Sequence, residues 1–184
     1  MPEFIEYMYH GTRAPKERLY SEGIRPLSSE EAWSLIREAL GHFGVDEETW
    51  RRRGIAYDSI KRRFDFAGKM VWVTDSFDNA VSYARRAPET ISVAIEDILK
   101  VKYGYYRLRN EARVTAMRAR ISAQTKFYLS RKFGPPKVVK LDVRNMGLTG
   151  GVNVPIGEFV PPDRILDVAI LPSKVSVLGR LELW

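Results

Sequence analysis

The sequence predicts an α+β fold, and three observations support this class. Its 184 residues suit one domain, so we expect a single domain over residues 1–184. A hydrophobic fraction of 45% and a charged fraction of 29% are ordinary for a folded chain with one core. Short runs of aromatic and branched residues, typical of strands, share the chain with longer segments whose apolar residues recur at helical spacing.

The composition excludes several classes of protein. The chain has no cysteine and two histidines, His10 and His42, which excludes disulfides and a histidine-rich zinc centre, so we expect no metal. No run approaches the roughly 20 consecutive apolar residues that a membrane span needs. The N-terminus, with Glu3 and Glu6, lacks the basic start of a signal peptide. We therefore expect a cytoplasmic protein without membrane contact.

The first predicted strand covers residues 4–9 and is followed directly by His10 and Gly11. Because the run stops at a glycine, we place His10 at the carboxyl end of this strand, where chemistry is often located. A histidine in such a position is also commonly a structural residue with satisfied hydrogen bonds. The segment by itself therefore leaves both interpretations open.

Residues 28–66 predict a helical insertion. Ser28 and Glu31 have the spacing of a capping box, and we expect Gly41 to end the helix that they begin. Two further helical pieces follow and are broken at Gly54.

A short buried strand is predicted at 70–74, and Asp75 or Ser76 is expected to cap a helix over 77–87. The core-facing stripe of this helix is Phe77, Ala80, Val81 and Ala84. Tyr83 lies at the edge of the stripe, where it can face a cleft and stack on a flat ring. Its alternative role is a tyrosine at a helix edge with its hydroxyl in water.

The remaining strands are predicted at 91–95, 138–143, 153–160 and 166–171, with a last edge strand at 181–184. Gly147, Gly150 and Gly151 form a loop that is flexible enough to move over a site. The same loop can be interpreted as a plain hairpin connection.

Residues 107–132 predict a basic amphipathic helix. Eight basic residues and one acid, Glu111, give this segment a net charge of +7, which equals that of the whole chain. At about 100° per residue, one stripe is apolar and consists of Val114, Met117, Ile121 and Tyr128. Within about 40° of one another on a second stripe lie Arg109, Arg113, Arg120 and Arg131, here named the arginine stripe. It is either a solvated helix face or a track for the phosphates of nucleic acid or a dinucleotide.

Three segments carry a resemblance to a known family. They are Tyr9-His10-Gly11-Thr12 followed by Glu22-Gly23-Ile24, the run from Val71 to Ala84, and the run from Gly157 to Ile165. In this order they resemble the signature motifs of the ADP-ribosyltransferase superfamily, with 28–69 and 103–137 outside the resemblance. Similar patterns occur in poly-ADP-ribose polymerases and RNA 2′-phosphotransferases. The resemblance implies a split, strongly twisted, antiparallel-rich sheet with helical insertions, and NAD as co-substrate.

The resemblance also implies roles for individual residues. Cleavage of the bond between nicotinamide and ribose develops positive charge at ribose C1′, so a fixed carboxylate there is useful. Glu158 is implied to accept a hydrogen bond from the ribose 2′-hydroxyl and to orient the nucleophile. His10 is implied to bind the adenosine-side ribose and Gly11 the carboxamide, with Thr12 and Arg13 facing the same pocket. Spacing alone favours the other interpretation of Glu158, a surface acid on a strand edge.

The second motif completes the implied cofactor site with Trp72, Thr74 and Tyr83. Trp72 departs from the family pattern, because polymerase-like and toxin-like members commonly have tyrosine there and the RNA 2′-phosphotransferases have histidine. Tryptophan can stack on nicotinamide, but it has one donor and no acceptor. Glu158 in the third motif favours transfer of ADP-ribose over removal of a 2′-phosphate.

We therefore expect an NAD-consuming mono-ADP-ribosyltransferase that acts on a macromolecule, with nucleic acid or another acidic target favoured by the basic segment. Two alternatives stay open. One is an RNA 2′-phosphotransferase-like enzyme, and the other is a non-catalytic module that keeps the fold and binds nucleic acid through the arginine stripe.

Overall fold

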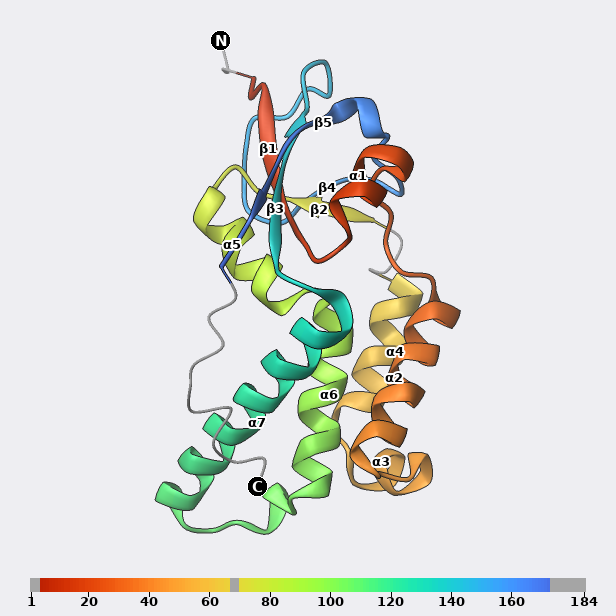
Figure 1. The fold of residues 1–184 in the computed structure, drawn as a ribbon, viewed down its shortest axis with the longest axis vertical. Helices are drawn as coiled ribbons and strands as arrows, with labels where there is room; N and C mark the ends of the chain where they lie inside the picture. Colours follow the sequence, from red (N-terminus) through yellow and green to blue (C-terminus); the bar gives the residue numbers. More distant parts are fainter. Residues whose placement is uncertain (1–3, 67–69, 173–184) are drawn as a thin grey trace. The chain divides into compact units, whose positions relative to one another are not determined.

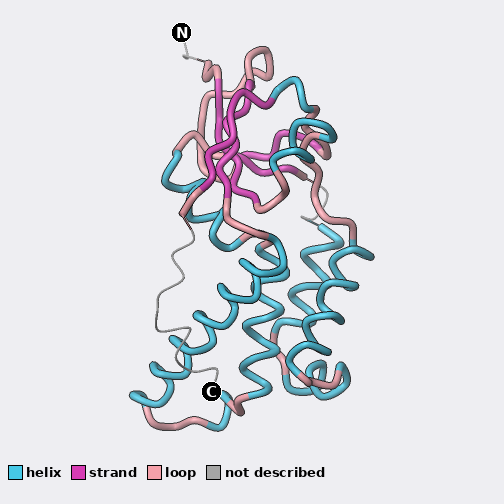
Figure 2. Tube along the Cα trace, viewed as in Figure 1, coloured by secondary structure: helices cyan, strands magenta, loops and turns pink. Residues whose placement is uncertain are grey.

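A computed structural model describes residues 4–66 and 70–172 (Figures 1 and 2). Helices and small antiparallel sheets confirm the α+β class. The elements in chain order are β1 (Tyr7–Thr12), α1 (Lys16–Glu22), α2 (Ser29–Phe43), α3 (Glu47–Arg53), α4 (Ala56–Phe66), β2 (Val71–Val73), α5 (Phe77–Arg86), α6 (Glu89–Lys102), η1 (Tyr105–Arg107), α7 (Glu111–Phe133), β3 (Lys137–Asp142), β4 (Val154–Gly157), η2 (Pro162–Arg164) and β5 (Ile165–Ile170).

Over the described residues the chain divides into two compact units. The first comprises 4–27, 70–88 and 132–172, and the second comprises 28–66 and 89–131. Every strand of the described residues lies in the first unit, whereas the second is helical. The helical part is therefore larger than the insertion predicted at 28–66, because 89–131 belongs to it as well.

The first unit contains two small sheets. Three antiparallel strands are hydrogen-bonded in the order β1-β3-β5, and β2 pairs antiparallel with β4. The backbone of Tyr9 in β1 exchanges two hydrogen bonds, of 2.8 and 2.9 Å, with Thr74, which directly follows β2. This bridge joins the sheets, and one buried core cluster takes residues from both of them, including Met8, Val73 and Val139.

Helix α5 packs against β1 and β3 (Figure 1). Gly11 permits this packing, because a Cβ there would lie 2.5 Å from the Ala80 carbonyl oxygen and would also clash with the Ala84 nitrogen. Strand β1 continues through Gly11 to Thr12, so the prediction of a strand that ends before His10 was wrong. The glycine serves close packing of a helix on the strand and does not terminate it.

The second unit is built around Asp97 of α6, which is buried. Its carboxylate accepts hydrogen bonds from Trp50 Nε1 at 2.9 Å, Tyr106 Oη at 2.5 Å, and the backbone nitrogens of Ala56 at 3.3 Å and Ile55 at 3.4 Å. Asp97 thereby caps the first turn of α4 from another helix, where a negative charge is favourable. A Cβ at Gly54 would collide with the same carboxylate, so this position suits a glycine. Burial and the bond to Asp97 raise the pKa of Tyr106.

Residues 91–95, predicted as a strand, lie within α6, so that prediction was wrong. Ile91, Ile95 and Ile98 are all fully buried and fall on one face of the helix. An apolar run of five residues has no period long enough to separate a buried strand from a buried helix.

Helix α2 begins as predicted and ends later. Ser28 Oγ accepts from Glu31 N at 3.1 Å and Ser28 N donates to Glu31 Oε2 at 2.8 Å, which confirms the capping box. The helix passes Gly41 and ends before Gly44, whose φ of 64° is left-handed. Gly41 was therefore the wrong stop, because the helix ends at the glycine that adopts the left-handed conformation.

The basic helix is present as α7, but it begins at Glu111, so Arg109 precedes it and does not share its helical face. The edge strand predicted at 181–184 lies outside the described residues. No helix in the described part of the chain is both long and apolar enough to span a membrane.

We expect Gly11→Ala to lower the free energy of unfolding by about 1–3 kcal/mol or more, because the added methyl group overpacks the contact with α5. Urea denaturation measures the change. Gly41→Ala is the matched control, since no atom lies within 4 Å of its added Cβ, and should stabilise by up to about 1 kcal/mol. Unchanged stability of Gly11→Ala would contradict the packing described.

We expect Asp97→Asn to lower the free energy of unfolding by about 2–5 kcal/mol, because the new amide group faces buried donors and each donor left unpaired costs about 1–3 kcal/mol. Urea denaturation followed by tryptophan fluorescence measures this loss. The exposed Asp163 provides the control, where the same change should alter stability by less than about 0.5 kcal/mol. Equal effects at both positions would show that Asp97 does not organise its unit.

Candidate functional site

His10 is held in one orientation by the backbone of the neighbouring strand. Its side chain is partly buried, and Nδ1 lies 2.8 Å from the carbonyl oxygen of Trp72 in β2. A carbonyl only accepts hydrogen bonds, so Nδ1 carries the proton. Burial lowers the pKa of His10 despite the opposing hydrogen bond to Trp72, which favours the neutral ring at pH 7. In the neutral ring Nε2 is then an acceptor.

Trp72, whose carbonyl holds His10, has an exposed side chain. The Trp72 side chain is 41% exposed, whereas Val71 and Val73 on either side of it are buried. This alternation places the indole on the outer face of β2. Thr74 is buried, and its hydroxyl accepts from the Ser76 nitrogen at 3.2 Å, which starts the turn into α5. The Trp72 side chain is therefore accessible to a ligand, whereas the Thr74 side chain stabilises the turn into α5.

Thr12 and Arg13, predicted to face the NAD pocket, are occupied within the fold. The Thr12 hydroxyl accepts from Ala14 N at 3.2 Å. Arg13 is 5% exposed, and its guanidinium donates to the carbonyl oxygens of Gly134 at 2.7 Å and Arg85 at 3.0 Å. Arg85 lies in the last turn of α5, where a cation is favourable. Both side chains thus contribute to the first unit's own structure.

Glu158 directly follows β4 and is exposed. Gly157 before it has a φ of 139° and pairs with Val71 of β2, one residue from Trp72. His10, Trp72 and Glu158 therefore belong to neighbouring strands or their ends, in the order β1, β2 and β4. The structure connects His10 to the Trp72 carbonyl by a hydrogen bond, and Glu158 lies just after β4, the strand that pairs with β2.

Tyr83 is partly buried on α5, one residue before Ala84. Ala84 packs against Gly11, and the neighbouring His10 projects from the opposite face of β1. Helix α5 therefore covers the face of β1 that His10 does not occupy. The predicted convergence of Tyr83 with His10 and Glu158 stays a prediction.

All four members of the arginine stripe, Arg109, Arg113, Arg120 and Arg131, are exposed. The Arg120 guanidinium lies 4.5 Å from the centroid of the Tyr103 ring, and that of Arg131 lies 5.8 Å from the Phe127 ring. Stacking of this kind holds a guanidinium by its face and leaves its edge for an acceptor. Solvated surface and phosphate track both remain compatible with this exposure.

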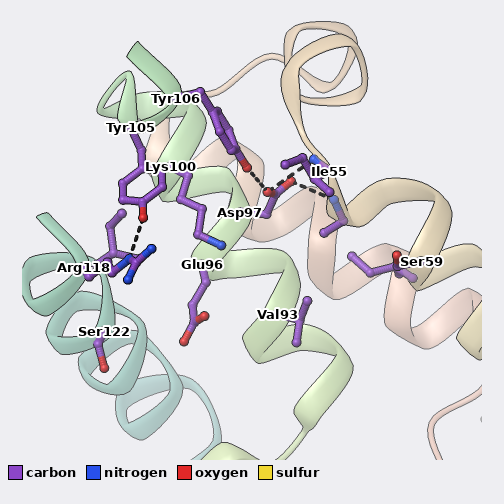
Figure 3. Close-up of a pocket in the computed structure, with 13 residues that line it drawn as sticks. Ile55, Ser59, Val93, Glu96, Asp97, Lys100, Tyr105, Tyr106, Arg118 and Ser122 are labelled. Atoms are coloured by element: carbon purple, nitrogen blue, oxygen red, sulfur yellow. Dashed lines mark hydrogen bonds between the residues drawn. The ribbon is translucent and has the colours of Figure 1, made fainter. Parts of the chain in front are cut away.

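The second unit contains a pocket of about 690 Å³ that the sequence did not predict (Figure 3). Residues of α4, α6, η1 and α7 line it, including Lys100 and Arg118. Arg118 is one of the eight basic residues of the segment 107–132. Its position in the sequence gives no sign that it lines the same pocket as Lys100, which is on another helix. Over 4–66 and 70–172, no three histidine, aspartate or glutamate side chains gather as metal ligands.

We expect long-range ¹H–¹⁵N NMR at pH 7.5 to show His10 neutral and protonated at Nδ1. Because folding lowers its pKa below the ordinary 6.5, the unfolded chain takes up the proton first as the pH falls. The contribution of His10 to stability is therefore present above about pH 6.5 and decreases below it. Protonation at Nε2 instead, or a charged ring at pH 7.5, would contradict the assigned hydrogen bond.

The chain matches no protein-family model, no curated protein and no solved structure in the comparisons made with each.

Proposed function

We propose that the first unit binds NAD and transfers its ADP-ribose to a macromolecular acceptor, either nucleic acid or protein. The observation that carries this proposal is the imidazole of His10, whose orientation is fixed by a hydrogen bond to the Trp72 carbonyl. Its Nδ1–H is engaged by the Trp72 carbonyl, so Nε2 can accept a hydrogen bond from a ribose hydroxyl. The resemblance of three segments to ADP-ribosyltransferase motifs supplies the reaction class.

The residues beside His10 suit the remaining parts of NAD. The exposed indole of Trp72 offers a flat apolar face for nicotinamide. Glu158 offers an exposed carboxylate for the positive charge that develops at ribose C1′ when the bond to nicotinamide breaks. The bonding electrons leave with nicotinamide, which departs neutral and needs no acid. The acceptor then forms its bond at C1′ and releases a proton.

Removal of an RNA 2′-phosphate is the less favoured reaction. Trp72 stands where the resembling phosphotransferases have a histidine, and an indole has no acceptor.

A nucleic-acid-binding module without catalysis is the second candidate, and the exposure of all four arginines in the arginine stripe supports it. The same exposure favours nucleic acid as the acceptor of the transferase.

We expect Glu158→Gln to reduce the rate of nicotinamide release from NAD by about a hundredfold or more, with little change in NAD affinity. The carboxylate acts mainly on charge that develops in the transition state. His10→Ala should instead weaken NAD binding, because its hydrogen bond exists in the ground state. Release is measured with and without RNA, DNA or protein, and binding by calorimetry.

Glu48→Gln provides the matched control, because Glu48 is an exposed acid in a surface ion pair with Arg52, lies outside the three resembling segments and should leave release unchanged. Equal turnover of wild type and Glu158→Gln would refute the catalytic role. Wild-type protein that neither binds nor cleaves NAD, yet binds nucleic acid with an affinity that falls steeply with salt, would establish the binding module instead.

A further inference from the structure

The pocket of the second unit has no part in the proposed NAD chemistry. Its volume of about 690 Å³ falls within the range of about 300–1,000 Å³ typical of small-molecule sites. It is formed within one unit, by α4 and the residue before it, α6, η1 and α7. Its shape therefore depends on helices that share one core.

One side of the pocket is apolar. Ile60 of α4 and Ile121 of α7 are buried and Val93 of α6 is partly buried, and all three line the pocket. Side chains of this kind have no hydrogen-bonding groups, so they favour an apolar ligand body.

The polar side of the pocket is rich in hydrogen-bond donors. Arg118 donates Nε–H to Tyr105 Oη at 2.6 Å, which orients the guanidinium and leaves its terminal N–H groups for another acceptor. Lys100 adds an ammonium group with three donors. Asp97 also lines the pocket, but its carboxylate already accepts four hydrogen bonds.

Glu96 is the lining carboxylate that retains acceptor capacity, and it lies four residues before Lys100 on α6. Figure 3 shows the Lys100 and Glu96 side chains extending from α6 in the same direction, with the carboxylate at the far end of Glu96. No ion pair joins these two side chains in the described part of the chain, so the Lys100 ammonium keeps its donors for a ligand acceptor.

We propose that this pocket binds a small amphiphilic anion. Its apolar body covers Ile60, Val93 and Ile121, and its carboxylate, phosphate or sulfonate accepts hydrogen bonds from Lys100 and Arg118. Two cationic donors beside an apolar wall recognise this combination of charge and apolar surface, whereas a neutral ligand of the same shape uses the wall alone.

The test uses the full chain and two fluorescent probes of similar shape. One is the anion 8-anilinonaphthalene-1-sulfonate, and the other is its neutral counterpart N-phenyl-1-naphthylamine. We expect the anion to bind one site, and Lys100→Met or Arg118→Met to weaken it about tenfold or more, as for loss of a charge-assisted hydrogen bond. The neutral probe should bind wild type and both variants alike.

Two further variants complete the test. Lys126→Met removes an exposed cation of α7 outside the pocket lining and should change neither affinity. Ser122→Trp fills the pocket from α7 and should abolish binding of both probes, with a thermal melt to verify folding.

Anion binding that survives Ser122→Trp, or that is insensitive to Lys100→Met in a folded variant, would overturn the proposal. The probe titrations do not depend on nicotinamide release, so failure of the anion proposal and failure of the NAD proposal can be distinguished.

Discussion

The contact between α5 and Gly11 determines where the proposed chemistry of the first unit can lie. Only a residue without a side chain lets the backbone of α5 approach β1 so closely. With α5 on that face, alternation along the strand directs His10 to the other face. The bridge between Tyr9 and Thr74 then brings β2 alongside, so that the Trp72 carbonyl can hold the imidazole. The packing of Gly11 thus sets the face of β1 from which His10 projects, and the Trp72 carbonyl sets its tautomer.

The helices of the second unit are joined through one buried carboxylate. Asp97 could not be buried without partners, since an unpaired charge in an apolar interior is strongly unfavourable. Its four donors come from the start of α4 and the segment just before it, from α3 and from η1, so the penalty of burial is offset by bonds that also join these elements. The same hydrogen bonds hold part of the pocket wall, because Asp97 and Tyr106 line the pocket.

Features governed by neighbours in the sequence could be predicted, and features governed by distant packing could not. The capping box of Ser28 and Glu31 and the cap at Ser76 depend on residues three apart, and both are present. The identity of the glycine that ends α2 depends on which one adopts the left-handed conformation, and Gly41 and Gly44 look alike in the sequence. Ile91 and Ile95 are compatible with a strand or a helix, and only packing against distant parts of the chain selects the helix. The burial of Arg13, and the meeting of Lys100 with Arg118 across two helices, have no local signal at all.

Arg13 has a consequence for how the family resemblance should be understood. The buried guanidinium of Arg13 donates hydrogen bonds to two carbonyl oxygens and so fixes the end of β1. Gly11 is required by the close packing of α5. Folding alone therefore explains two residues of the His-Gly-Thr-Arg segment. Selection for folding alone would keep both residues, with or without the proposed reaction. Gly11 and Arg13 therefore indicate the fold and not the reaction. His10 and Glu158 are the residues whose retention in related chains would indicate the proposed activity.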